Sequence, residues 1–363
     1  MTGLAAYVRE PLDPALPPLD PAALGDPHAQ DLEPLVYATL TRAGQLARQS
    51  ADVEARLVRA WREARLLEPF RRDETVRVLD ALEAAGVRPL LFKGTPLAYR
   101  CYPEPWLRPR NDTDLLIRAS DEPRAARALE DLGYTRRPRP SGEHVTHQSA
   151  WTAVRSGLHF EWDVHWKLSD PQVFADLFPY DSLASRAVAV PALGGAARTV
   201  DDVDALLVAC VHRVAHHYDQ PTLIFLYDVA LLADRVTAAS RWLELTERAK
   251  AAGIAAVTRR GLDLARSLLN AAVPADVVRS LDRASPNEPT AAYLKPSLRK
   301  IDILKSDLSR LAWRGRLRLL SEHLFPPRDY MIRKYGDRPR VPLPLLYAAR
   351  IFSGALSWFK PLG

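Results

Sequence analysis

The chain has 363 residues, of which 47% are hydrophobic and 26% are charged, and its formal net charge at pH 7 is +6. This balance is ordinary for a soluble globular protein, and two distant cysteines exclude a disulfide framework or a paired-cysteine metal site. The mild basic excess suits nucleotides, nucleic acid or acidic membrane without choosing among them. The N-terminus has no signal-peptide pattern and no long uncharged apolar run occurs, so we expect a cytoplasmic chain without a transmembrane segment.

The N-terminal part is predicted to be a leader followed by helices. Residues 10–27 are rich in proline and acid, which predicts a flexible leader over residues 1–29. From there to residue 86 the apolar residues recur at helical spacing, in separate stretches. We therefore expect an N-terminal helical region over residues 30–86, with Gly86 capping its last helix.

Short strands and turns alternate in the next part, residues 87–190. VRPLLF, residues 87–92, predicts a buried strand. Gly94 follows, and then Thr95-Pro96, a pair that is typical of a helix start. The next predicted strand is DTDLLIR, residues 112–118.

A β-hairpin is predicted further on. Residues 144–154 and 158–168 flank Arg155-Ser156-Gly157, which is a turn sequence. The second run alternates strictly, so one face is apolar and the other is polar and titratable. The polar face carries His159, Glu161, Asp163, His165 and Lys167.

The C-terminal part is predicted to be helical. Residues 191–198 resemble a linker, and from Thr199 the apolar spacing is helical again, so we expect a C-terminal helical domain over residues 199–363. The fold class is therefore α+β: a small mixed β-sheet core flanked by N- and C-terminal helical regions. The apolar tail predicts a helix that closes the core. The alternative is a helix that lies on a membrane surface, which is disfavoured because the tail has few basic residues for such a face.

Two aspartates, Asp112 and Asp114, begin the second strand and share one of its faces. Like charges this close oppose each other unless a cation lies between them, and the usual cation is a metal ion. Solvated surface acids are the alternative interpretation. Upstream, Lys93 and Gly94 stand at a strand-to-helix turn that suits a phosphate.

Further residues extend this pattern. Thr95 adds a hydroxyl, Arg108 and Arg110 add positive charge, and a later strand adds Glu161 and Asp163. Paired carboxylates that hold Mg²⁺ beside a phosphate cradle are what nucleotidyl transfer requires.

Together these residues resemble the polymerase-β-type nucleotidyltransferase superfamily, and within it a group of bacterial proteins described as uncharacterised nucleotidyltransferases. The resemblance covers roughly residues 85–235, and a weaker similarity extends to about residue 350. The motifs that carry it are Phe92-Lys93-Gly94, Tyr102-Pro103, Arg108, Asp112-Thr113-Asp114 and Asp163-Val164-His165-Trp166. The chain departs at Thr95, where serine is usual, at Lys93, where an apolar residue is common, and at Asn111, where glycine is frequent; no departure removes a carboxylate.

The resemblance implies a nucleotidyltransferase core over residues 87–190. It implies an enzyme that transfers an NMP from an NTP, with ATP favoured, to a hydroxyl or phosphate of an unknown acceptor and releases pyrophosphate. The implied catalytic and Mg²⁺-binding residues, for two ions, are Asp112, Asp114 and Asp163. The implied nucleotide-binding residues are Lys93, Gly94, Thr95 and Arg108. The spacing of the residues does not decide whether Glu161 or Asp163 is the third acid. The resemblance selects Asp163, because the acid of the family stands directly before x-His-Trp.

Three further residues, His165, His216 and Asp228, are candidates for the surroundings of the cleft. His165 is expected to pack or to support a ligand rather than bind metal directly. His212 and His216 share a helix face at a spacing that zinc can use, but no glutamate follows His212 as in zincins, so helix packing or a polar contact toward the cleft is favoured. Asp228 is expected to cap a helix, to pair across the helices or to line the cleft.

The alternative function is a non-catalytic or antitoxin-like protein that keeps the fold and acts through a protein partner. The three retained acids favour the enzyme. A polymerase is disfavoured because no extended basic and aromatic stripe, which would grip a nucleic-acid strand, occurs in the sequence. The acceptor stays open among small molecules, peptides and proteins.

Overall fold

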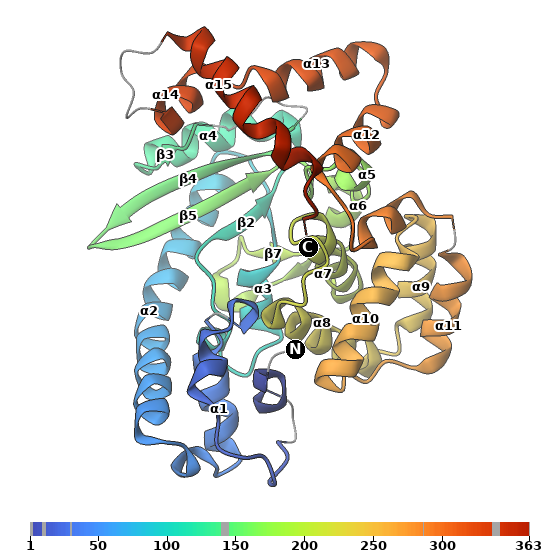
Figure 1. Ribbon diagram of the computed structural model, residues 1–363. Coiled ribbons are helices and arrows are strands. Elements are labelled where there is room, and N and C mark those ends of the chain that lie inside the picture. The colour runs from blue at the N-terminus through green and yellow to red at the C-terminus, as the bar shows by residue number, and fades with distance from the viewer. Residues whose placement is uncertain are drawn as a thin grey trace.

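The computed structural model describes residues 3–8, 12–29, 31–138, 145–285, 287–335 and 342–362. Within these residues, seven strands form one mixed sheet, with helices on both faces and a further group of helices at one end (Figure 1). This architecture confirms the predicted α+β fold, a small mixed sheet flanked by helical regions.

The order of the strands in the sheet is β3-β4-β5-β2-β1-β7-β6. β1 runs antiparallel to β2, β2 runs parallel to β5, and β4 and β5 form the predicted hairpin. The strands are β1 (Leu90–Phe92), β2 (Thr113–Leu116), β3 (Thr135–Arg136), β4 (Gln148–Arg155), β5 (Leu158–His165), β6 (Val188–Ala189) and β7 (Arg198–Thr199).

The helices precede, interrupt and follow the sheet. Those up to the end of the sheet are α1 (Glu33–Arg42), α2 (Ala51–Ala84), α3 (Gly94–Arg100), α4 (Glu122–Asp131), α5 (Gln172–Ala175) and α6 (Tyr180–Ala184). Those after the sheet are α7 (Asp202–Ala215), α8 (Leu223–Ala238), α9 (Trp242–Ala251), α10 (Ala255–Leu269), α11 (Ala275–Ala284), α12 (Lys300–Arg310), α13 (Trp313–Leu324), α14 (Arg328–Tyr335) and α15 (Leu343–Ala355).

Alternation along the strands sorts the side chains onto two faces. On one face, Leu115 and Trp162 belong to an apolar cluster that α2 and α4 complete. On the other face, Phe92 and Leu116 belong to a larger cluster that α7, α8 and α10 complete. Asp114 neighbours Phe92 across the strands and faces the same side, so the acids lie between the sheet and the C-terminal helices.

Helix α2 is longer than the sequence predicts. Ser50 caps its start by accepting a hydrogen bond from the Val53 N–H, and Gly86 follows its end with a φ of +72°. Two separate helices are expected here, but the helix continues through Pro69. A proline removes one backbone donor, and here the helix-forming residues on both sides outweigh that loss.

The N-terminal segment and the expected linker differ from expectation. Leu4, Val8 and Leu19 are buried in the same cluster as the C-terminal helices, so these side chains of the segment pack against the core. The apolar residues of this segment are interspersed with prolines. A prediction from the overall composition of the segment does not take these individual apolar residues into account. Residues 191–198 connect β6 to β7, and β7 pairs with β1, so this segment extends the sheet.

The last helices leave apolar side chains uncovered. α13, α14 and α15 gather at one end of the molecule (Figure 1). In α15, Leu346 is buried but Leu345 and Phe352 are exposed, so the tail helix buries only part of its apolar surface. Among the described helices, none has both the length and the apolar character needed to cross a membrane.

Candidate active site

The pairing of β2 with β5 brings two of the predicted acids together. The strands run parallel, with Asp114 opposite Asp163. Both side chains therefore project from the same face of neighbouring strands. β1 lies on the other side of β2 and pairs Phe92 with Asp114, which brings the next residue, Lys93, to the same place.

The Asp114 carboxylate is buried and held by two partners. The Lys93 ammonium donates to its Oδ1 at 2.7 Å, and His165 Nε2 lies 2.9 Å from the same oxygen. Burial alone would raise the pKa of this carboxyl, but the Lys93 charge and the His165 hydrogen bond outweigh it and hold the pKa well below its usual range. Asp114 is therefore ionised at neutral pH.

The Asp163 carboxyl is less well satisfied. Gln148 Nε2 donates to its Oδ2 at 3.0 Å, while its Oδ1 is buried and has no hydrogen-bond partner among the described residues. Burial and the negative charges of Asp114 and Asp112 raise its pKa to about 7. An orphaned carboxyl oxygen beside a second carboxylate is the arrangement that a bound cation satisfies.

The donor set fits a divalent cation. Ligand atoms of Asp114, Asp163 and His165 all lie within 4.8 Å of one another. Burial and the nearby Lys93 charge lower the pKa of His165, so its imidazole is neutral, the form that binds metals. The geometry thus places His165 among the candidate ligands, where the sequence suggests only packing or support.

Asp112 stands apart from this group. It lies one residue before β2, is exposed, and does not belong to the set within 4.8 Å. Although the residue as a whole is exposed, the protein around its carboxyl excludes part of the water there, and this and the charge of Asp114 raise its pKa to about 6. Glu161, the alternative third acid, pairs with Arg137 at 2.7 Å. Asp163, and not Glu161, is therefore the residue that lies opposite Asp114.

The turn after β1 is built from an unusual backbone conformation. Lys93 has φ 60° and ψ −135°, a region that residues with side chains rarely adopt and that is found at functional sites. At Gly94, an added Cβ would make ordinary contacts with Arg110 at 3.6 Å and Arg108 at 3.8 Å, so both arginine side chains lie close to this glycine. Thr95 is buried and its hydroxyl lies 3.0 Å from that of Thr113, which ties α3 to β2.

Arg108 and Asp228 form a buried pair across the molecule. Arg108 Nε and Nη2 donate to the Asp228 carboxylate at 2.9 and 2.8 Å, and Tyr102 donates to it at 2.7 Å. Asp228 thus takes the pairing that was one of its expected roles. Arg110 is likewise buried and bonded to Glu68 of α2. The guanidinium groups that were expected to hold phosphate are engaged by protein carboxylates in this structure.

An imidazole cluster covers this side of the sheet. His212, His216 and His217 gather with Phe225 of α8, with ring centroids 5.1 Å apart for His212 and His216 and 4.4 Å for His217 and Phe225. Burial and the Lys93 charge lower the pKa of His216 to about 3 and that of His217 to about 4. His216 Nε2 is buried without a partner among the described residues. The negative charge of Asp114 acts in the opposite direction on this pKa, without outweighing burial and Lys93.

Gln148 is a site residue that the sequence interpretation misses. The predicted turn pairs Arg155 with Leu158, and counting back along the hairpin places Gln148 opposite His165. The signal was therefore in the sequence, as a polar residue at a fixed register beside Asp163. The Lys93 conformation left no such signal, because a positive φ is expected of glycine.

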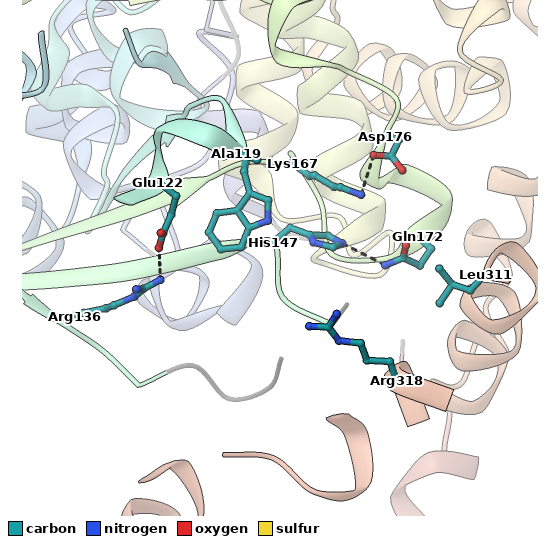
Figure 2. Close-up of a pocket in the computed structure, with 10 residues that line it drawn as sticks. Ala119, Glu122, Arg136, His147, Lys167, Gln172, Asp176, Leu311 and Arg318 are labelled. Atoms are coloured by element: carbon teal, nitrogen blue, oxygen red, sulfur yellow. Dashed lines mark hydrogen bonds and ion pairs between the residues drawn. The ribbon is translucent and has the colours of Figure 1, made fainter. Parts of the chain in front are cut away.

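A sizeable cavity lies away from these acids. It measures about 610 Å³, sits beyond the C-terminal end of β5 and is lined by Lys167 and Gln172 among others (Figure 2). Two ion pairs join residues of its lining, Glu122 with Arg136 and Lys167 with Asp176 (Figure 2). The cavity that touches Lys93, Arg108 and His212 is only about 30 Å³.

Comparison with known proteins adds one match. The model of a family described as "uncharacterised nucleotidyltransferase" matches residues 27–270, about two thirds of the chain. No curated protein and no solved structure matches. The matched segment contains the whole sheet, the acids, His165 and the imidazole cluster. The chain therefore belongs to this uncharacterised nucleotidyltransferase family.

Proposed function

We propose that this chain is a divalent-metal-dependent nucleotidyltransferase, which transfers an NMP group from an NTP to a hydroxyl or phosphate of an acceptor and releases pyrophosphate. Membership of the family supports nucleotidyl transfer in general. The observation that carries the proposal is the strand register, which sets Asp114 beside Asp163 with a neutral imidazole at metal-ligand distance.

In this proposal, Asp114, Asp163 and His165 hold one cation, and Asp112, at the exposed edge, joins Asp114 in holding a second. Bound there, divalent cations such as Mg²⁺ would stabilise the charge on the attacking and leaving oxygens. Asp163 keeps the unpartnered Oδ1 for this purpose.

The remaining residues act on the nucleotide and the acceptor. Lys93 pairs with Asp114 in this structure. On nucleotide binding it would turn to the triphosphate, and Gly94, which has no side chain, would let a phosphate approach the backbone. Arg108 stays paired with Asp228 and does not bind a phosphate directly. Its positive charge makes the electrostatic potential at the phosphates more favourable.

Asp163 orients the acceptor oxygen and accepts its proton. That oxygen bonds to the α-phosphorus, the bond from the α-phosphorus to its bridging oxygen breaks, and pyrophosphate leaves. ATP is the favoured donor. Because the cavity at Lys93 holds little more than a water molecule, a nucleotide requires displacement of Lys93 or entry from the exposed Asp112 edge.

Thermal unfolding tests this proposal without knowledge of the acceptor. A ligand that binds only the folded state raises the unfolding temperature. We expect ATP or another NTP to do so only when Mg²⁺ or Mn²⁺ is present, and Asp114→Asn to abolish the effect. If no NTP stabilises the protein with either cation, the proposal is wrong, and a non-catalytic function through a protein partner becomes the better account.

A further inference from the structure

The positive charge of the chain is concentrated at its C-terminal end. Residues 313–363 contain ten Lys and Arg and three Asp and Glu, a net charge of +7. The first 312 residues contain 40 and 41, a net charge of −1. The segment also lies beyond residue 270, where the match to the nucleotidyltransferase family ends. The net charge of the whole chain is thus a property of this end and not of the catalytic core.

The same end exposes large apolar side chains. Helix α13 has Trp313, Leu317, Leu320 and Leu324 at spacings of four, three and four, which form one stripe along the helix. Trp313 and Leu317 are 64% and 60% exposed. Other exposed apolar residues among the described part of this segment are Leu324, Phe325, Ile332, Leu345, Ile351, Phe352 and Phe359.

This surface is held by the fold and is not a frayed tail. Leu319, Met331 and Leu346 bury the inner sides of α13, α14 and α15. Tyr347 of α15 donates to the Pro326 carbonyl, just after α13, at 2.8 Å, and its ring lies 5.6 Å from that of Phe325. α14 packs against α15, and all three helices lie at the same end of the molecule (Figure 1). The apolar stripe therefore faces outward on a fixed support.

We propose that the group formed by α13, α14 and α15 docks on an anionic lipid surface. Helices that lie in the membrane interface combine basic residues with exposed Trp, Phe and Leu, and their binding grows with apolar burial and with attraction to anionic headgroups. Both features occur together here. Arg314 lies over the ring of Trp313, with 5.2 Å from its guanidinium carbon to the ring centroid, so a cation stands beside the first apolar side chain of the stripe.

Other occupants fit less well. A second copy of the chain would bring two segments of charge +7 together, which is repulsive. Nucleic acid would meet the positive charge but leave the leucine stripe in contact with phosphate and water. An anionic bilayer takes up both the charge and the apolar side chains.

Flotation of the full chain with lipid vesicles tests the proposal. We expect binding to phosphatidylcholine vesicles that contain a quarter phosphatidylglycerol, little binding to pure phosphatidylcholine, and loss of binding as salt is raised. Trp313→Ser with Leu317→Ser should abolish it. The matched control is Leu66→Ser with Phe70→Ser, which removes side chains that are 70% and 55% exposed at the same spacing on α2.

A second pair of variants tests the charge. Arg314→Gln with Arg328→Gln should weaken binding about 25-fold, at about fivefold for each basic residue near the surface. The control, Arg59→Gln with Arg62→Gln, lowers the net charge by the same amount but on α2, and it should change vesicle binding by less than about twofold.

Three results would overturn the proposal. The first is a wild-type protein that does not bind anionic vesicles. The second is a Trp313 and Leu317 variant that is folded by circular dichroism and still binds. The third is a wild-type protein that does not bind the vesicles but forms a dimer or binds nucleic acid, and loses that dimer or that nucleic-acid binding in the Trp313 and Leu317 variant. None of these measurements depends on nucleotidyl transfer.

Discussion

Asp163→Asn is expected to stabilise the metal-free protein at alkaline pH while it removes the response to divalent cations. The Asp163 carboxyl has a pKa raised to about 7, because it is partly buried and lies beside Asp114 and Asp112. An acid whose pKa is raised on folding binds its proton more tightly in the folded state. Its contribution to stability is therefore lost as the pH rises from about 4 through about 7.

The structure sets the size of this effect. A shift of about three pKa units corresponds to about 4 kcal/mol at the most, and partial exposure of the side chain lowers this to about 2 kcal/mol. Asparagine has nearly the same shape, has no charge to desolvate and can still accept the Gln148 hydrogen bond. Above pH 7 the variant should thus be more stable than the wild type, and below pH 4 the two should be equal.

Urea denaturation in EDTA at pH 5 and pH 8, repeated with Mg²⁺ or Mn²⁺, is the assay. At pH 8, the cation should stabilise the wild type and leave Asp163→Asn unchanged. Turnover should fall by about 10²–10⁴-fold, the scale for loss of an acid–base group. Glu161→Gln is the control, because Glu161 pairs with Arg137 at the surface and should show none of these changes. A variant that is less stable than the wild type at pH 8 in EDTA, or that responds to cations as the wild type does, refutes the reasoning.

Three further predictions follow from the same site. Gly94→Ala should keep the fold, since the new Cβ meets no atom closer than 3.6 Å, yet weaken nucleotide binding about tenfold or more in a titration with NTP. Asp228→Asn should cost about 3–5 kcal/mol in denaturation because it leaves Arg108 buried and unpaired, whereas Asp181→Asn, which breaks an exposed pair, should cost less than about 1 kcal/mol. His165→Gln should lower the affinity for Mn²⁺ by about 10–100-fold and that for Mg²⁺ by less, as measured by calorimetry; equal losses for both ions would argue against an imidazole ligand.

Local pattern was sufficient to predict the framework of the site. The alternation over residues 158–168 and the turn at Arg155-Ser156-Gly157 predicted the hairpin, and the structure confirms it. The strand with Asp112 and Asp114 was predicted from its apolar run, and it lies beside both β1 and β5. These features depend on residues close in sequence, where periodicity and turn chemistry are informative.

Long-range pairing was not predictable in the same way. Arg108 and Asp228 are 120 residues apart, and nothing local indicates that one neutralises the other. His165 was expected to pack or to give support, because its distance from Asp114 depends on how β2 and β5 pair. The packing of Leu4 against the C-terminal helices is likewise a property of the assembled core.

The most direct test of the central claim follows the phosphorus atoms. The protein is incubated with Mg²⁺, a desalted extract of its native cells as the source of acceptor, and ATP labelled at either the α or the γ phosphorus. Nucleotidyl transfer predicts that the acceptor gains label from the α position only, that the γ label leaves as pyrophosphate, and that Asp163→Asn prevents both. Transfer of the γ label to the acceptor, or α labelling that persists in Asp163→Asn, would contradict the account.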